Sequence, residues 1–241
     1  MALRNSEVVV IGGKTRIAQA LVAESNNLGV RIRVVARTPE EALVLGNLYP
    51  HSSIVNSWQE PTLGIGPNQE VCIIICALGL VHPAPPDLEI DMERFRRDLS
   101  HMRDLFREAG AGVHAVLVSS VVALVPPRDR AYYATHKNLA ESATALLLRS
   151  LPSARLSVIY PGHLVEKRTW ATAEGLLASP YSSLAKELVT IARCGKQVMR
   201  VYGIDARLWL LARILRLALT AVSRNCRGIG LSSRDGRPRV Q

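Results

Sequence analysis

The sequence predicts an α/β fold in which a doubly wound parallel sheet carries helices on both faces. Three observations lead to this prediction. Short apolar segments alternate with helical segments along the chain, the central strands are apolar throughout, and a Gly-Gly pair follows the first strand. The 241 residues contain no internal repeat and no linker rich in proline, glycine or serine. We therefore expect a single domain.

The expected strands are short apolar runs between turn residues. In chain order they are residues 7–11 (EVVVI), 31–36 (RIRVVA), 53–55 (SIV), 71–77 (VCIIICA), 113–119 (VHAVLVS), 155–160 (RLSVIY) and 197–202 (QVMRVY). The first strand ends at Gly12-Gly13 and the sixth at Pro161-Gly162, which are residue types that terminate strands. The fourth carries no charge, which is typical of a strand buried on both faces.

The expected helices fill the intervals between these strands. In chain order they are residues 15–25, 39–48, 89–108, 132–149 and 182–192. The helix over residues 89–108 is charged and amphipathic. Strands that alternate with helices in this way indicate parallel pairing, because a parallel pair needs a crossover connection.

The C-terminal part of the chain differs from the rest in charge. We expect residues 1–204 to form the sheet domain and residues 205–241 to form a basic amphipathic helix and tail. Residues 191–241 hold 11 basic and 2 acidic residues, which is +9 of the net charge of +10. We expect a helix over residues 205–224, with Asp205 as its N-cap.

Around this C-terminal helix, polar residues share one sector and apolar residues cover the rest. At 100° per residue the polar sector holds Arg213, Arg216, Thr220, Ser223 and Arg224. Trp209 lies at its border, where an indole suits an interface. Three roles are open: peripheral contact with an anionic membrane, packing over the substrate pocket or a second subunit, and binding of nucleic acid. Nucleic acid is unlikely on the sequence, which has few aromatic residues and no base-reading motif.

Composition excludes several classes of protein. No stretch has the roughly 18 uncharged apolar residues that suggest a membrane span, and residues 1–7 leave no room for a signal peptide. The four cysteines have no spacing suited to zinc or to a disulfide framework, so we expect free, buried or half-buried thiols and no metal. We expect a cytoplasmic protein, with peripheral contact at the inner face of the membrane if the C-terminal helix binds lipid.

A first group of candidate site residues follows the first two strands. A glycine turn at a helix N-terminus lets backbone amides approach a pyrophosphate. The residues of this turn are Gly12, Gly13, Lys14, Thr15, Arg16 and Ile17. The second strand ends at Arg37 instead of the carboxylate that holds the ribose of NAD, and an arginine there favours the 2′-phosphate of NADPH. A plain strand-to-helix turn and a solvated arginine are the alternatives.

The strongest candidate site is formed by Ser120, Tyr133 and Lys137. Tyrosine and lysine four residues apart lie on one face of a helix, and Ser120 follows the fifth strand. A phenol is a poor acid–base group near pH 7 until a nearby ammonium lowers its pKa, which Lys137 would do. The serine hydroxyl can donate to a substrate carbonyl. Tyr132 does not fit, because it is five residues from the lysine.

With these motifs the chain resembles the short-chain dehydrogenase/reductase family, from Val8 to about Tyr202. The resemblance implies a Rossmann-type fold, a catalytic serine, tyrosine and lysine at the three positions above, and ribose binding by the lysine. It also implies cofactor contacts from Ala77 and Gly79 after the fourth strand and from Pro161 and Gly162 beside the nicotinamide. Residues 166–180 correspond to the family's variable substrate loop.

The chain departs from the family pattern in three places. Arg16 and Ala18 replace two loop glycines, the asparagines before Ala77 are absent, and the 89–108 helix lacks the fourth catalytic asparagine, to which Asp98 is the nearest equivalent. The loop and the C-terminal helix are loosely similar to the actinobacterial branch that contains decaprenylphosphoryl-2-ketopentose reductase. That similarity suggests a lipophilic or lipid-linked ketone.

The sequence therefore predicts an NADPH-dependent reductase of a ketone, or the reverse alcohol oxidation, by a protein that forms a homodimer or homotetramer. The intact serine, tyrosine and lysine favour this enzyme. The altered glycine loop and the missing asparagine favour the alternative, a non-redox protein on the same fold that acts as a cofactor-sensing regulator or a cyclase.

Overall fold

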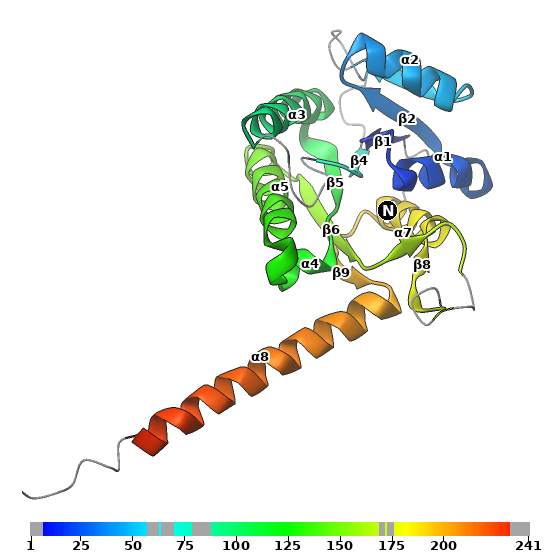
Figure 1. Cartoon of the computed structure of the whole chain (residues 1–241). Coiled ribbons are helices and arrows are strands. Elements are labelled where there is room, and N and C mark those ends of the chain that lie inside the picture. The colour runs from blue at the N-terminus through cyan, green and yellow to red at the C-terminus, as the bar shows by residue number, and fades with distance from the viewer. Residues whose placement is uncertain are drawn as a thin grey trace, which may run out of the picture.

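The computed structural model describes residues 7–56, 63, 70–78, 88–168, 172 and 176–231. Its centre is a sheet in the order β3-β2-β1-β4-β5-β6-β9, and every neighbouring pair is parallel (Figure 1). The strands are β1 (Glu7–Ile11), β2 (Arg31–Ala36), β3 (Ser53–Asn56), β4 (Val71–Ile75), β5 (Val113–Val118), β6 (Arg155–Pro161) and β9 (Met199–Tyr202). The predicted parallel sheet and single domain are confirmed.

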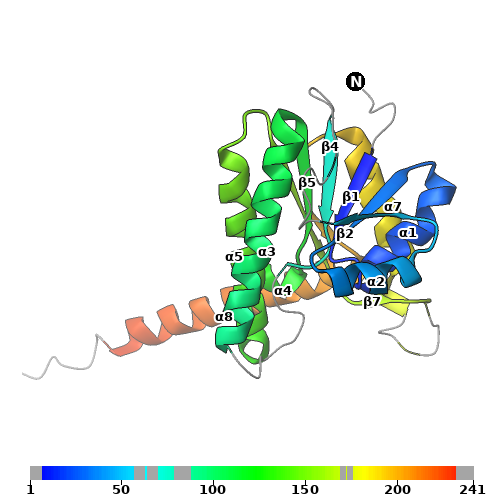
Figure 2. The ribbon, with the colours of Figure 1, turned by 90° about the horizontal axis from the view of Figure 1, so that it is seen from above.

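Helices cover both faces of this sheet (Figure 2). On one face α1 and α7 pack side by side, with Leu21 and Leu188 fully buried in one core cluster. On the other face α3 and α5 bury Phe106 and Ala140 in a second cluster. The helices between strands are α1 (Arg16–Leu28), α2 (Pro39–Leu48), α3 (Leu88–Ala109), α5 (Ala131–Arg149) and α7 (Tyr181–Cys194). The sheet is therefore doubly wound, as predicted.

The direction of strand order reverses between β1 and β4. From β1 the chain adds β2 and β3 on one side, and then crosses to add β4, β5, β6 and β9 on the other. Val8 pairs with Cys72 and Ile11 with Ile75 at this reversal. Ligands of doubly wound sheets bind outside the carboxyl ends of the strands at such a point. Gly12 and Ala77 follow these two strand ends.

Two strands end slightly earlier than the sequence predicts. β4 ends at Ile75 and β5 at Val118, although the next amide along each strand still makes a bond of the sheet type: Cys76 N donates to Ile11 O and Ser119 N to Ile159 O, each over 2.9 Å. The sequence pattern reports which residues are buried, and Cys76 and Ser119 are still buried although they lie just after the last regular strand residue. Three short elements are α4 (Val121–Leu124), β7 (Leu164–Val165) and β8 (Ser179–Pro180). They lie beside the carboxyl ends of the strands, since α4 follows β5, β7 follows β6 and β8 pairs with β7.

The last helix, α8 (Ile204–Leu231), extends away from the domain (Figure 1). It is longer than the predicted 205–224, and Asp205 lies in its first turn instead of at the N-cap position. Among the α8 side chains that the structure describes, those near its start pack on the domain: Ala206 is fully buried, and Trp209 and Leu210 join it in an apolar cluster. The role of the rest of α8 stays a prediction.

Candidate active site

The glycine turn after β1 is required by close packing. Gly12 has a φ of +86°, and a Cβ there would lie 2.8 Å from the backbone nitrogen of Ala77. A Cβ on Gly13 would lie 2.4 Å from a methyl group of Val34 and 2.8 Å from one of Leu45. Gly12 thus lets the backbone after β1 approach Ala77 after β4, which brings two predicted cofactor-binding positions together, and Gly13 lets it pack against β2 and α2.

The rest of the turn forms the beginning of α1. The Thr15 hydroxyl donates to Gly12 O (2.9 Å) and accepts from Ala18 N (3.2 Å), so it caps the helix. Lys14 and Arg16 are exposed, and Ile17 is half-buried. Positive side chains beside a helix N-terminus suit an anion. The Arg16 guanidinium also lies 3.6 Å from the Glu166 carboxylate, a weak surface pair.

Arg37 lies at the end of β2 but is bound by two carboxylates. Its Nε and one terminal nitrogen donate to Glu41 (2.9 and 2.8 Å), and the other terminal nitrogen donates to both oxygens of Asp98 (3.0 and 2.9 Å). The Glu41 and Asp98 side chains are 6% and 8% exposed. The hydrogen bonds that Arg37 donates to Glu41 raise the pKa of Arg37 despite burial. Burial raises the pKa of Asp98, against the pull of Arg37.

This ion cluster corrects two expectations. The β2 end does have a carboxylate beside it, because Glu41, near the start of α2, also accepts from the Arg37 backbone nitrogen (2.8 Å). Asp98 pairs with Arg37 and is not the replacement for the family's fourth catalytic residue beside Lys137. A signal for Glu41 was present in the sequence: Thr38-x-x-Glu41 is a capping pattern, and Thr38 accepts from Glu41 N.

Ser120, Tyr133 and Lys137 do come together. Ser120 precedes α4 and makes no capping bond with its side chain, and its hydroxyl hydrogen-bonds that of Tyr133. The Lys137 ammonium lies 5.6 Å from the centre of the Tyr133 ring. Tyr132, one residue earlier, instead packs its ring on His136, with 4.6 Å between ring centres. The two neighbouring tyrosines therefore have different partners: Tyr133 lies near Lys137 and Tyr132 packs on His136, in line with the spacing argument.

The protonation of these residues differs from the sequence prediction. Burial raises the pKa of Tyr133, and the bond with Ser120 and the charge of Arg130 offset it only partly. Burial also lowers the pKa of Lys137, against the nearby Cys76 and Glu141. The lysine was expected to lower the pKa of the tyrosine, but burial of both groups dominates. A buried phenol near pH 7 is a proton donor.

Glu141 is a site residue that sequence reasoning missed. It lies one helical turn beyond Lys137 in α5, and its carboxylate accepts from the hydroxyls of Ser119 and Tyr160 (2.5 and 2.9 Å). Burial and the bond to Glu141 raise the pKa of Tyr160. The signal was the continued four-residue spacing from Tyr133 through Lys137 to Glu141, which puts all three on one helix face. The Glu141 carboxylate thus lies one helical turn beyond Lys137, on the same face of α5.

The segment after β6 contacts the start of α8. Gly162 N donates to Tyr202 O (3.3 Å), and a Cβ on Gly162 would lie 2.1 Å from an oxygen of the Asp205 carboxylate. That carboxylate accepts from the backbone nitrogen of His163. Pro161 itself is buried as the last residue of β6. Gly79, the remaining predicted cofactor position, lies outside the described residues, as does part of the 166–180 loop.

Cys76 is the side chain that stands before Ala77, where the family has asparagine. It is buried near Lys137, and burial raises its pKa to about 12 despite a hydrogen bond from Thr15. Cys72 is likewise a buried free thiol, whereas Cys194 is exposed, which differs from the expectation of buried or half-buried thiols. Among the residues that the structure describes, no three His, Cys, Asp or Glu side chains lie together as metal ligands.

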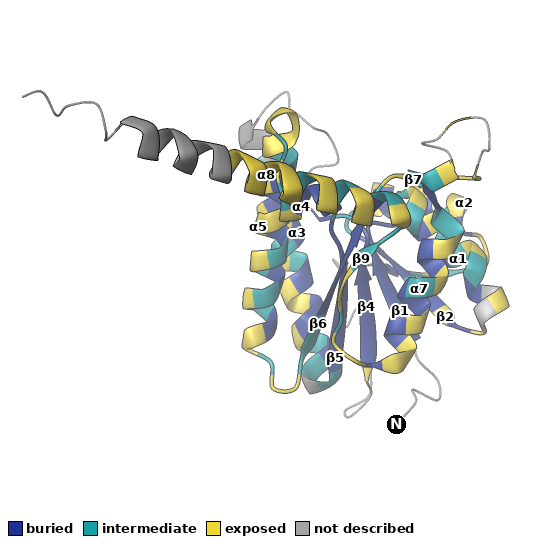
Figure 3. Cartoon of the chain, turned by 90° about the horizontal axis from the view of Figure 1, so that it is seen from below, coloured by how far each residue is buried: buried dark blue, intermediate teal, exposed yellow. Residues whose placement is uncertain are grey.

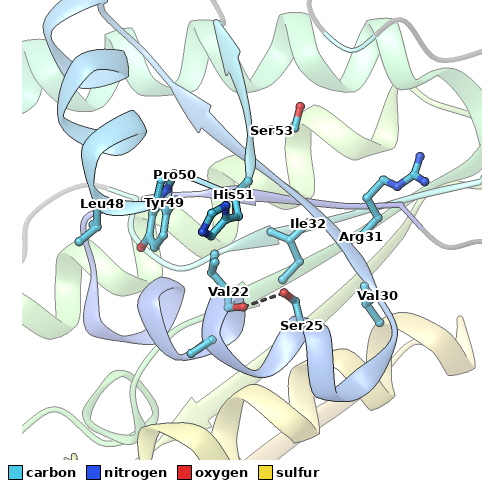
Figure 4. A pocket seen from close by; sticks show the side chains of 12 residues that line it. Val22, Ser25, Val30, Arg31, Ile32, Leu48, Tyr49, Pro50, His51 and Ser53 are labelled. Atoms are coloured by element: carbon cyan, nitrogen blue, oxygen red, sulfur yellow. Dashed lines mark hydrogen bonds between the residues drawn. The ribbon is translucent and has the colours of Figure 1, made fainter.

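A surface pocket of about 450 Å³ lies elsewhere, between α1, the start of β2 and the residues after α2 (Figure 4). Its lining includes Ser25, Arg31, Tyr49 and His51, and the Ser25 hydroxyl donates to Val22 O over 2.6 Å. This pocket is at the amino end of β2. Ligands bind at the opposite, carboxyl ends of the strands in this fold, so the pocket is not the candidate active site.

Comparison with known proteins places the fold. No protein-family model and no curated protein sequence matches the chain. Solved structures do match. A short-chain dehydrogenase/reductase (glucose/ribitol dehydrogenase) from Brucella melitensis superposes with a TM-score of 0.59 at 14% identity, over 83% of this chain and 97% of that one. A mutant short-chain dehydrogenase/reductase from Serratia marcescens gives 0.58 at 15%, over 84% and 98%.

A third structure, BdcA in complex with NADPH, gives a TM-score of 0.55 at 14% identity, over 83% of this chain and 94% of that one. The chain therefore has the Rossmann-like fold of the short-chain dehydrogenases/reductases. At this identity the likeness concerns the fold, and function has to be argued from the site.

Proposed function

We propose that the protein is an NADPH-dependent reductase of a lipophilic ketone, or a dehydrogenase that oxidises the corresponding alcohol with NADP⁺. The observation that carries the proposal is the contact of Ser120, Tyr133 and Lys137 at the carboxyl edge of the sheet. Gly12 and Gly13 pack the turn against Ala77, Val34 and Leu45, which sets its backbone at the start of α1, where a cofactor pyrophosphate can bind.

The site residues divide the chemistry between them. The nicotinamide, when bound, supplies the hydride. Tyr133 is the proton donor to the carbonyl oxygen, because burial keeps its phenol protonated. The Ser120 hydroxyl, which bonds that of Tyr133, polarises the same oxygen. Lys137 holds the ribose and stabilises the tyrosinate that forms as the proton leaves.

Glu141 supports the lysine in this proposal. The usual asparagine is absent and Asp98 is engaged with Arg37, so the proton lost by Tyr133 has to be restored by another route. Glu141 lies beyond Lys137 and accepts from two hydroxyls, which makes a chain of proton-carrying groups leading from the lysine.

In this proposal a residue of the glycine turn, Lys14, and not Arg37, accounts for the preference for NADPH. A 2′-phosphate would have to displace a carboxylate to reach the Arg37 guanidinium. Lys14 is exposed and its charge acts on Glu41, so it lies on the side of the turn that faces the β2 end. Lys14 is therefore the cation available to the 2′-phosphate.

The lipophilic substrate is inferred from the surroundings of Tyr133. Val121, Val122 and Leu210 form an apolar cluster against which this tyrosine packs. An apolar wall beside the proton donor favours a carbonyl compound with a large apolar part.

The test is a comparison of two tyrosine variants with a panel of ketones. Tyr133→Phe should retain NADPH binding, measured by fluorescence titration, and lower turnover roughly 100-fold or more. Tyr132→Phe, whose ring packs on His136, should lower it much less. A protein that binds NADPH and reduces no ketone would favour the non-redox alternative, and equal effects of the two variants would remove Tyr133 as the donor.

A further inference from the structure

Most of the α8 residues whose burial the structure describes, 204–220, are exposed, although the sequence of the helix is largely apolar. Every residue from Ile214 to Thr220 is exposed, and Leu211, Leu215 and Leu219 are 55%, 54% and 70% exposed (Figure 3). At 1.5 Å per residue the 28-residue helix is about 42 Å long, and of its described side chains those in its first three turns contact the domain. Leucines left in water over this length indicate a surface that a partner covers.

Four of the exposed leucines lie on the side of α8 that faces away from the domain. The domain-facing side is marked by Ala206, Trp209, Leu210 and Arg213, the last of which donates to Pro126 O over 3.2 Å. At 100° per residue these four fall within one sector of about 100°. The opposite sector holds Leu208, Leu211, Leu215 and Leu219. A flat surface can therefore contact the apolar side without meeting the domain.

The charge of α8 is almost entirely positive. Its 28 residues hold five arginines and one acidic residue, Asp205. The Asp205 carboxylate already accepts from His163 N at the root of the helix. Beyond the first turn the helix therefore offers positive charge alone, beside an apolar side. This combination is typical of helices that lie in the headgroup layer of an anionic membrane.

We propose that α8 docks the protein on an anionic phospholipid surface, with its apolar side at the acyl boundary and with the charge of its arginines attracting the anionic headgroups. The helix lies in the surface and does not cross it: within the described residues no helix is both long and apolar enough to span a bilayer, and Arg213 and Arg216 interrupt the apolar run. A second copy of the chain is the less suitable partner, because its α8 is equally basic and would leave the arginines of both helices without an anionic partner.

Docking in this orientation has a consequence for the site. α8 begins directly after β9, at the carboxyl edge of the sheet, and Ala206 packs on Val121 and Val122, which follow Ser120. Tyr133 contacts the same cluster. The docked helix therefore holds the Ser120–Tyr133 side of the domain close to lipid. This step rests on the proposed function, and it identifies the substrate as a carbonyl compound that partitions into the membrane.

The experiment measures flotation of the full chain with vesicles, which requires no turnover. Vesicles contain phosphatidylcholine alone or mixed with phosphatidylglycerol. The apolar variant is L211Q/L215Q, and its matched control is L43Q/L146Q, two exposed leucines outside α8 (73% and 61% exposed). The charge variant is R216Q/R224Q. We expect the parent and the control to bind the mixed vesicles, with L211Q/L215Q at least about tenfold weaker.

R216Q/R224Q should lose the preference for phosphatidylglycerol and the sensitivity to salt. Circular dichroism of each variant shows whether the fold is retained. Absence of parent binding, or equal binding by L211Q/L215Q and the parent, would overturn the proposal. So would a parent dimer that L211Q/L215Q dissociates while vesicle binding is unchanged, since a second copy would then cover α8. Because binding is measured apart from catalysis, failure of the proposed reductase activity leaves this result unaffected.

Discussion

Replacing Arg37 with alanine tests the ion cluster that changes the interpretation of the cofactor site. The side chain joins β2 to α2 through Glu41 and to α3 through Asp98. The variant would leave both carboxylates, 6% and 8% exposed, without the guanidinium that binds them. We therefore expect Arg37→Ala to act first on stability, and to weaken NADPH and NADH binding to a similar degree.

The expected magnitude follows from burial. Removing one partner of a buried ion pair costs about 3–5 kcal/mol, because the remaining charge stays buried. The Arg37 side chain is itself 28% exposed, so water screens part of this effect, and we expect a loss of about 2–4 kcal/mol. Without the arginine the pKa of each carboxyl rises in the folded state. Folding then binds protons, so the variant should be less destabilised at about pH 5 than at about pH 8.

The assay is urea denaturation of the parent, Arg37→Ala and a control at both pH values. Arg31→Ala is the matched control, because Arg31 is exposed at the start of the same strand. Adding Glu41→Gln and Asp98→Asn to Arg37→Ala should restore part of the stability, since no buried charge then remains. If Arg37→Ala were as stable as Arg31→Ala and lost NADPH binding alone, Arg37 would be free to bind the 2′-phosphate and the cluster argument would fail.

Three further predictions concern the site. Lys14→Gln should weaken NADPH binding by about tenfold and NADH binding much less in a fluorescence titration; equal losses would show that Lys14 does not meet the 2′-phosphate. Because burial raises the pKa of Tyr133, ketone reduction should hold its rate from about pH 7 to about pH 9 and decline only as the phenol deprotonates, whereas alcohol oxidation should rise with pH. A fall in reduction within that range would contradict the assignment. Glu141→Gln should lower kcat more than it raises KM and should shift the alkaline limb of the pH–rate profile of ketone reduction. Tyr160→Phe, which removes one hydroxyl bonded to Glu141, should shift that limb less. An unchanged pH–rate profile in Glu141→Gln would limit Glu141 to a structural role.

Much of the fold could be predicted because burial leaves a local mark on the sequence. β4 reads VCIII and is buried at every position, so its apolar run states both its type and its place in the centre of the sheet. The pairing of Ser120, Tyr133 and Lys137 was also predictable, since helix periodicity fixes two of them and strand polarity fixes the third.

The parts that were missed depend on distant contacts. Arg37 and Asp98 are 61 residues apart, and no local pattern pairs them. The pKa of Tyr133 follows from how deeply α5 packs, which sequence spacing does not report. The direction of α8 depends on a few contacts at its root, and its composition alone suited packing and membrane binding equally well.

The reversal of strand order between β1 and β4 also constrains how the chain folds. The pairing of β1 with β2 is the more local one, since Glu7 and Arg31 are 24 residues apart. The pairing of β1 with β4 joins Val8 to Cys72, which are 64 residues apart. Closing the longer loop costs more chain entropy and slows the step. The two sets of strands can gain most of their secondary structure before that contact is made. Gly12 and Ala77, one on each side, meet only when it is made, so the two halves of the predicted cofactor site form only after this non-local step.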